Sequence, residues 1–303
     1  MIKHLIVISG PTASGKTALA IAVAQALHCE IVSADSRQVY KELNIGVARP
    51  SEEELTSVQH HFIASHSVNH ELDVASYEKE AIEKITSLFL SNDYIVVAGG
   101  SGLYIDAILY GIDEMPQNDE EIAAELKAIW ESQGLMPLLE ELERSDPEYC
   151  QTVDRSNPVR ILRALNVIRS SGKPFSGFRK KQVVKRDFKA HFFYIDIPRA
   201  ILYDRINSRV DIMLESGLEK EVEKVKIYRG SRALNTVGYS EWPVDGVKDE
   251  KQRAEIIEKI KQFSRNYAKR QVTWFKKKPV IEIQWHENVY VMKDRVLEIL
   301  RMD

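Results

Sequence analysis

Cysteine is scarce in this chain of 303 residues, and its scarcity limits the kinds of site that the chain can build. The two cysteines, Cys29 and Cys150, lie far apart in the sequence, and neither has a second ligand at a metal-binding spacing. This usage excludes a zinc site held by cysteines and is typical of a reducing compartment. We therefore expect a cytoplasmic protein.

Long apolar runs are also missing. The two longest, residues 5–8 and 95–98, are far shorter than the roughly 20 residues that a membrane-spanning helix requires. The first of them leads into a glycine-rich turn and not into the small-residue cleavage site of a secretory signal. We expect no membrane span and no signal peptide.

A strong net charge is absent as well, because 42 basic residues are offset by 45 acidic ones and the formal net charge is −3. Such a chain does not coat nucleic acid by general electrostatics, so any RNA contact must be local. Basic residues do gather between Arg155 and Lys189. They are Arg160, Arg163, Arg169, Lys173, Arg179, Lys180, Lys181, Lys185 and Arg186. Composition leaves open whether this run is a solvated face or a contact surface.

What the chain does contain is a succession of short apolar strands that end in small polar residues. Strands are expected at residues 5–8, 30–33, 94–98 and 191–197. Helical periodicity is clear over residues 17–27 and 76–90, between the first three strands. The alternation predicts an α/β fold: a parallel sheet of the P-loop NTPase type, flanked by helices, with its site at the carboxyl ends of the strands.

The pattern changes between residues 113 and 187, where we expect helices and see no clear strand. These helices are expected at residues 119–133, 135–143 and 158–170. We expect this stretch to be a helical insertion, with residues 1–112 and 188–303 forming the catalytic core. Three further helices are expected after the last strand, at residues 199–216, 219–228 and 250–275.

A phosphate-binding loop follows the first strand. Its residues match the pattern G-x-x-x-x-G-K-[ST] and are Gly10, Pro11, Thr12, Ala13, Ser14, Gly15, Lys16 and Thr17. Backbone N–H groups and the following helix N-terminus face a diphosphate or triphosphate in such loops, while Lys16 adds a positive charge and Thr17 offers a hydroxyl to Mg²⁺. The motif leaves open whether the phosphates belong to a nucleotide.

The acidic residue that nucleotide hydrolases place at the end of a neighbouring strand is missing here. Residues 95–98 run instead into Gly-Gly-Ser-Gly at 99–102. The one well-placed carboxylate is Asp35, after the second strand. It is either a helix cap or ion-pair partner, or a group that accepts a proton from a nucleophile beside the phosphate loop.

Five further motifs accompany the phosphate loop. They are Ser-Ala-Asp-Ser-Arg-Gln-Val-Tyr at 33–40, Gly-Gly-Ser-Gly-Leu-Tyr at 99–104, Asn-Pro-Val-Arg-Ile-Leu-Arg-Ala-Leu at 157–165, Val-Gly-Tyr at 237–239 and Ala-Lys-Arg-Gln-Val-Thr-Trp at 268–274. In number and order they resemble the motifs of bacterial tRNA dimethylallyltransferases. The resemblance extends over nearly the whole chain and is far more specific than the phosphate loop alone.

The resemblance implies that the phosphate loop holds the diphosphate of dimethylallyl diphosphate, which explains the missing acidic residue. It implies that Asp35 contacts the exocyclic amine of a tRNA adenine and takes its proton. Lys16 and Arg209 would stabilise the negative charge that develops on the leaving diphosphate. Ser101, where the family usually has threonine, would hydrogen-bond to the diphosphate.

Arg205 and Arg209 lie one helical turn apart and share a face of the expected helix. We expect Arg205 to join Arg209 at the diphosphate. Apart from the resemblance, the two arginines could equally form surface ion pairs with Asp204, Asp211 and Glu215.

The resemblance also suggests which residues contact tRNA. Those expected at the flipped-out base and its neighbours are Asp35, Ser36, Arg37 and Gln38. Arg160 and Arg163 are expected on the anticodon stem-loop. Gly238, Tyr239 and Arg270 complete the expected tRNA-binding set.

The function expected is transfer of a dimethylallyl group from dimethylallyl diphosphate to N6 of the adenosine immediately 3′ of the anticodon, by a monomer that uses Mg²⁺. One alternative is a small-molecule kinase of the same fold, with Asp35 as the base and Arg205 and Arg209 as lid residues. Others are a tRNA-binding protein with an inactive phosphate loop and a prenyltransferase of free adenine nucleotides. The kinase has no use for the basic insertion, and the nucleotide prenyltransferase would not need Arg160 and Arg163.

Overall fold

The computed structural model describes residues 2–180 and 183–302. The chain forms two compact units, one of Met1–Leu109 with Lys185–Asp303 and the other of Tyr110–Val184. The second unit begins and ends slightly earlier than the insertion expected at 113–187, and the N–H of its last residue, Val184, donates to the carbonyl of its first, Tyr110, at 2.8 Å. Lys181, one of its basic residues, lies outside the described residues.

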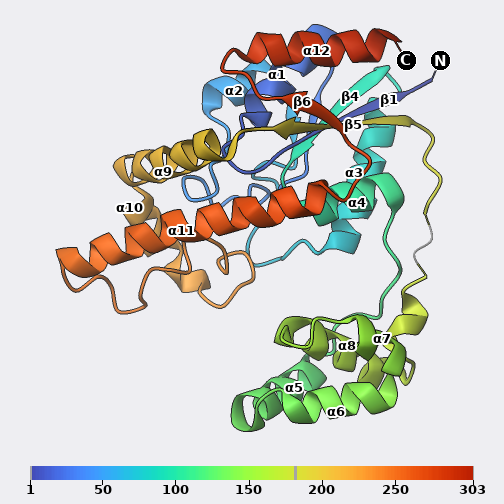
Figure 1. Ribbon diagram of the computed structural model, residues 1–303, viewed down its shortest axis with the longest axis vertical. Helices are drawn as coiled ribbons and strands as arrows, with labels where there is room; N and C mark the ends of the chain where they lie inside the picture. The colour runs from blue at the N-terminus through green and yellow to red at the C-terminus, as the bar shows by residue number, and fades with distance from the viewer. Residues whose placement is uncertain (1, 181–182, 303) are drawn as a thin grey trace. The chain divides into compact units, whose positions relative to one another are not determined.

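A parallel sheet forms the centre of the first unit (Figure 1). Its strands are β1 His4–Ser9, β2 Ile31–Ser33, β3 His60–His61, β4 Tyr94–Gly99, β5 Lys189–Asp196 and β6 Ile281–Gln284. Within the described residues the order across the sheet is β3-β2-β4-β1-β5-β6, and Ile6 pairs with Val96 on one side and His191 on the other. The expected parallel α/β sheet is confirmed, with an edge strand on each side that the sequence did not predict.

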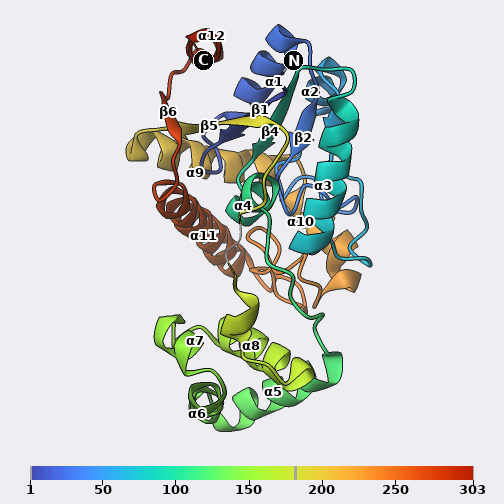
Figure 2. The same cartoon turned by 90° about the vertical axis from the view of Figure 1, so that its right-hand side faces the viewer.

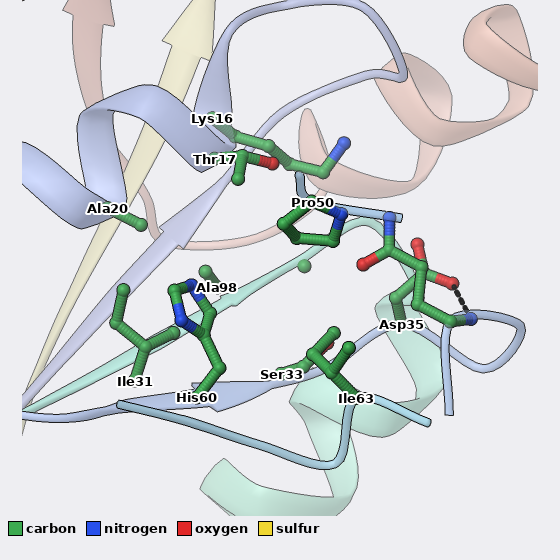
Figure 3. A pocket seen from close by; sticks show the side chains of 12 residues that line it. Lys16, Thr17, Ala20, Ile31, Ser33, Asp35, Pro50, His60, Ile63 and Ala98 are labelled. Carbon is green, nitrogen blue, oxygen red and sulfur yellow. Dashed lines mark hydrogen bonds between the residues drawn. The ribbon is translucent and has the colours of Figure 1, made fainter. Parts of the chain in front are cut away.

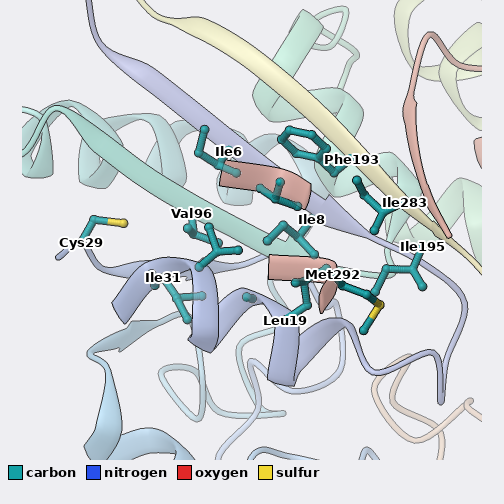
Figure 4. Close-up of a cluster of buried hydrophobic side chains, with 14 of the residues drawn as sticks. Ile6, Ile8, Leu19, Cys29, Ile31, Val96, Phe193, Ile195, Ile283 and Met292 are labelled. Carbon is teal, nitrogen blue, oxygen red and sulfur yellow. The ribbon is translucent and has the colours of Figure 1, made fainter. Parts of the chain in front are cut away.

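Helices flank this sheet (Figure 2). They are α1 Lys16–Leu27, α2 Glu52–Ser57, α3 Val74–Leu88, α4 Gly102–Tyr110, α9 Arg199–Glu215, α10 Leu218–Val225, α11 Glu250–Phe275 and α12 Val289–Met302. Helices α1 and α12 pack on the sheet through a buried cluster that includes Ile8, Leu19, Val96, Phe193 and Met292 (Figure 4). Burial of each such side chain contributes about 1.5–3 kcal/mol, so the cluster anchors β1 and α1 on either side of the phosphate loop.

The carboxyl ends of β1, β2 and β4 meet at one edge of the sheet, because neighbouring parallel strands point the same way. Gly10 follows β1, Asp35 lies just after β2, and Ser101 lies just after β4. Gly99 permits this close approach, since a Cβ there would lie 2.1 Å from the Ala34 carbonyl oxygen. Three motifs that are distant in the sequence therefore meet at the edge where a parallel sheet places its site.

The second unit is built from helices: α5 Glu120–Gln133, α6 Met136–Ser145, α7 Pro147–Thr152 and α8 Pro158–Ser171. Its apolar core includes Leu126, Leu138, Leu142, Ile161 and Leu165. The buried carboxylate of Asp146 caps α7 by accepting the Tyr149 N–H at 3.0 Å, and it also accepts the Ser176 N–H at 2.7 Å. No helix among the described residues of either unit is long and apolar enough to cross a membrane.

Candidate active site

A cleft of about 740 Å³ lies within the first unit, at the carboxyl edge of the sheet. The phosphate loop, the turn at 35–38, the loop at 46–48, the segment 235–241 and helices α9 and α11 all contribute to its walls. Of the residues expected at the diphosphate, Thr12, Ala13, Gly15, Lys16, Thr17, Arg205 and Arg209 line the cleft. The structure therefore brings the two arginines of α9 to the phosphate loop.

The phosphate loop curls tightly before α1 begins. Ala13 and Gly15 have positive φ angles of 65° and 91°, and the Ser14 N–H donates to the Pro11 carbonyl at 3.1 Å. Gly10 is packed against Ser14, whose Oγ would lie 2.6 Å from a Cβ at position 10. No side chain caps the α1 N-terminus within the described residues, so the N–H groups of its first turn remain available to an anion.

The arginines of α9 contact the loop in two ways. Arg205 Nε donates to the Ala13 carbonyl oxygen at 2.7 Å and so supports the loop backbone. Arg209 Nη1 donates to Thr12 Oγ1 at 3.3 Å. Burial, and then repulsion by the nearby Arg205, lower the pKa of Arg209. An anion at the loop would relieve this repulsion.

Lys16 extends from the start of α1 beside Thr17 (Figure 3). Burial lowers its pKa to about 8, Asp35 opposes that change, and Arg209 adds to it. A small extension of the site, about 20 Å³, is bordered by Lys16, Thr17, Ser33 and Asp35. A space of this size holds about one water molecule.

Asp35 has one carboxylate oxygen fixed by the turn that follows it. Its Oδ1 accepts the backbone N–H groups of Arg37 at 2.9 Å and Gln38 at 3.2 Å. In the described part of the chain, Oδ2 has no hydrogen-bond partner. The carboxylate is therefore held in place while one oxygen remains able to accept a proton from a substrate.

Ser101 supports that turn from β4. Its Oγ accepts the Ser36 N–H at 2.9 Å and donates to Ser36 Oγ at 3.1 Å. Burial raises the pKa of nearby Tyr267 to about 12, Asp35 adds to the rise, and a hydrogen bond with Ser101 opposes it. The Ser101 hydroxyl, expected at the diphosphate, here positions Ser36 and Tyr267 around Asp35.

Gln271 on α11 was not among the site residues expected from the sequence, although its motif was recognised. Its side chain is buried, with Oε1 accepting the Thr12 N–H at 2.8 Å and Nε2 donating to the Gly100 carbonyl at 2.9 Å. The fit is close, because a Cβ at Gly100 would lie 2.3 Å from Nε2. One amide thus joins the phosphate loop to the segment after β4.

Tyr239 helps to shape the cleft indirectly, because it supports a neighbouring loop. It is only 2% exposed, and its hydroxyl donates to Glu221, whose carboxylate also accepts the N–H groups of Ile45 at 2.8 Å and Gly46 at 3.1 Å. Gln38 holds the same loop from the other side, since its Nε2 donates to the Ala48 carbonyl at 2.8 Å. Both residues were expected to contact tRNA, and in the structure both shape the loop at 46–48.

The remaining residues expected at tRNA fall into two groups. Ser36, Arg37, Gly238 and Arg270 line the cleft. Arg270 also lies over the Tyr267 ring, 5.7 Å from its centroid. Arg160 and Arg163 belong to α8 of the second unit, where Arg160 is exposed and Arg163 Nη2 donates to the Pro116 carbonyl at 2.8 Å.

Comparison with known proteins identifies the family. The sequence profile of the IPP transferases matches residues 38–278. The tRNA dimethylallyltransferase of Flavobacterium johnsoniae is 46% identical over 91% of this chain and 91% of its own length, and that of Cytophaga hutchinsonii is 44% identical over 93% and 92%. The chain belongs to the IPP transferase family.

A solved IPP transferase structure agrees with the fold. The tRNA delta(2)-isopentenylpyrophosphate transferase of Staphylococcus epidermidis superposes with a TM-score of 0.69 at 31% identity, over 99% of each chain. Membership confirms the resemblance predicted from the motifs and makes the protein a prenyl-transferring enzyme. The kinase alternative is not favoured, and neither is a binding protein without catalysis.

Proposed function

We propose that this IPP transferase moves a dimethylallyl group from dimethylallyl diphosphate to N6 of the tRNA adenosine immediately 3′ of the anticodon, giving N6-isopentenyladenosine and diphosphate. The observation that supports this most directly is the position of Asp35. Its carboxylate, fixed through Oδ1 only, lies in the same cleft as the cationic phosphate loop.

The diphosphate of the donor is assigned to the phosphate loop. The N–H groups at the start of α1 and the side chains of Lys16 and Arg209 offer positive charge to it, while Arg205 holds the loop backbone. Negative charge develops on the diphosphate as its bond to carbon breaks, so these fixed charges stabilise the transition state more than the ground state.

Mg²⁺ fits this site through one protein ligand. Thr17 borders a space that holds about one water molecule, and the described residues contain no cluster of three histidine, cysteine or acidic side chains that could hold a metal by themselves. Mg²⁺ usually keeps several waters and binds substrate phosphates with only one or two protein ligands, so Thr17 and a diphosphate are sufficient. When bound, the ion would neutralise charge on the diphosphate.

The adenine amine is assigned to Asp35. An exocyclic amine is a poor nucleophile because its lone pair is delocalised into the ring, and a hydrogen bond to a carboxylate favours its attack. In the transfer, the N6–carbon bond forms, the carbon–oxygen bond breaks with its electron pair on the diphosphate, and the amine proton moves to Asp35. Ser101 keeps the turn that carries the carboxylate in position by accepting the Ser36 N–H.

The acceptor is assigned to tRNA because the named relatives act on tRNA and because the cleft presents groups that suit a nucleotide. Arg37 and Arg270 line the cleft beside Asp35, where they can contact phosphates and base edges. A base inside a stacked loop must leave its stack to reach such a cleft, as in other enzymes that modify bases. The exposed Arg160 of α8 is assigned to the RNA backbone.

Mass spectrometry of nucleosides tests the proposal. The protein is incubated with dimethylallyl diphosphate, Mg²⁺ and either unmodified tRNA, the same tRNA with guanosine at the target position, or free adenosine monophosphate. We expect N6-isopentenyladenosine only in digests of the first tRNA. Product from the free nucleotide but not from tRNA would assign the enzyme to free nucleotides, and product from neither would overturn the proposal.

A further inference from the structure

Part of the cleft wall is apolar. We call this part the apolar lobe and define it by Val210, Met213, Val237, Ile260 and Phe263. Val210 and Ile260 are buried in the packing between α9 and α11, but Phe263 is 42% exposed. The ring of Phe263 therefore faces the cleft and is not buried in the core beneath it.

Helix α11 arranges three cleft residues in order. Gln271, Tyr267 and Phe263 are spaced four residues apart, so they share one face and lie about 6 Å from one another along the axis. Gln271 contacts the phosphate loop, and Tyr267 lies beside Ser101 and Asp35. Phe263 lies one turn from Tyr267, on the side away from Gln271.

Along α11, Phe263 lies two turns from Gln271, the residue that contacts the phosphate loop. The reacting carbon must lie between the diphosphate and Asp35, so the short dimethylallyl chain is confined to the stretch from Gln271 to Tyr267. Phe263 lies one turn past Tyr267 along the same helix. The exposed ring of the lobe is therefore assigned to the acceptor RNA, next to the adenine.

The chemistry of the lobe suits a nucleobase. Single-stranded nucleic acid binds where an exposed aromatic ring lies among cations, because bases stack on the ring and phosphates pair with the charges. Arg209 and Arg270 line the same cleft as Phe263. We propose that Phe263 is a stacking platform for a base directly adjacent to the target adenosine, an inference that rests on the function proposed above.

A double-mutant cycle between protein and RNA tests this platform. Wild-type protein and Phe263→Ala are titrated with an anticodon stem-loop RNA, either intact or with an abasic nucleotide directly 5′ or directly 3′ of the target adenosine. We expect Phe263→Ala to weaken binding of the intact RNA by roughly 5- to 150-fold, as for loss of one base–aromatic stack. At one of the two positions, the abasic RNA should bind both proteins almost equally, because the stack is already lost.

Two further variants make the result specific. Phe263→Tyr should bind like wild type because it keeps the ring, and Tyr290→Ala removes an exposed aromatic of α12 outside the lobe and should change nothing. If Phe263→Ala weakens binding of the intact RNA and of both abasic RNAs by the same factor, Phe263 does not stack on either neighbouring base and the platform is overturned. An equal loss of dimethylallyl diphosphate affinity would also overturn it by assigning the lobe to the donor. Prenyl transfer by wild type to the intact stem-loop, measured in parallel, reports separately on the proposed function.

Discussion

Two effects at the phosphate loop change the pKa of Lys16 in opposite directions. Burial disfavours its charged form and lowers its pKa to about 8, while the carboxylate of Asp35 favours the charge. A bound diphosphate would also favour the charge and raise the pKa towards its ordinary value. The protonation state of Lys16 is thereby coupled to occupancy of the loop.

Donor affinity should consequently depend on pH. Below pH 8 Lys16 is charged before the donor arrives, whereas above pH 8 it is mostly neutral and must take up a proton on binding. Each pH unit above 8 should weaken binding by about tenfold until the pKa of the bound state is reached. Calorimetry in buffers of different ionisation enthalpy should detect the proton uptake.

Replacing Lys16 by methionine provides the control for this prediction. The variant should bind dimethylallyl diphosphate more weakly at every pH and lose the dependence between pH 8 and 9. Equal affinity of the wild type at pH 7 and pH 9 would show that Lys16 does not titrate as described.

At the scale of elements, α11 connects parts of the site that strands β1 and β4 supply separately. Its Gln271 satisfies a donor on the phosphate loop and an acceptor at Gly100 with one side chain. Gln271→Ala removes the partner of the half-buried Thr12 N–H and of the buried Gly100 carbonyl, and a buried backbone group left unpaired costs about 1–3 kcal/mol. We expect a lower free energy of unfolding in urea and weaker donor binding.

Gln271→Glu distinguishes the two hydrogen bonds. Its carboxylate can still accept the Thr12 N–H but cannot donate to the Gly100 carbonyl, so it should restore only part of the stability. Lys269→Ala, an exposed change on the same helix, should leave both unfolding and donor binding unchanged. Wild-type stability of Gln271→Ala would contradict the account.

The sequence predicted most of the long elements and few of the short ones, and it also missed α12, a helix of 14 residues. The helix from 250 to 275 was located with its observed bounds, because a regular apolar stripe runs along it. Helix α4 was missed because it begins within the Gly-Gly-Ser-Gly segment, which is typical of a turn. Strand β6 has four residues, and its pairing with β5 depends on a partner far away in the sequence.

At the scale of the molecule, the proposed donor site and Arg160 belong to different units. The cleft lies in the first unit, and Arg160 lies on α8 of the second. If Arg160 contacts an RNA phosphate, Arg160→Ala should reduce the salt dependence of tRNA binding by about one unit in the log–log slope. Donor affinity should not change. Filter binding at several salt concentrations measures both the slope and the affinity.

Arg155→Ala is the matched control for Arg160. Arg155 is exposed on the same unit but pairs with Glu143 at 3.2 Å, so its removal should leave the slope unchanged. Arg163→Ala is less informative, because Arg163 also holds the Pro116 carbonyl and its loss would disturb the unit itself. An unchanged slope for Arg160→Ala would remove this residue from the RNA interface.

The residues of the site were predictable to different degrees. The phosphate loop and Asp35 were identified because each motif is continuous in the sequence. Gln271 and Glu221 were missed because their roles depend on contacts with Thr12 and with the loop at 44–46, far away along the chain. Tyr239 was recognised through its motif, but only the fold reveals that its hydroxyl is buried against Glu221.

The account as a whole depends on Asp35 as the proton acceptor in a cleft that holds both substrates. Asp35→Asn tests this directly, because the amide oxygen can still accept the N–H groups of Arg37 and Gln38 and preserve the turn. With saturating donor and tRNA, the single-turnover rate of transfer should fall by about 10²–10⁴-fold while both substrates still bind. A single-turnover rate near that of the wild type at neutral pH would contradict the account.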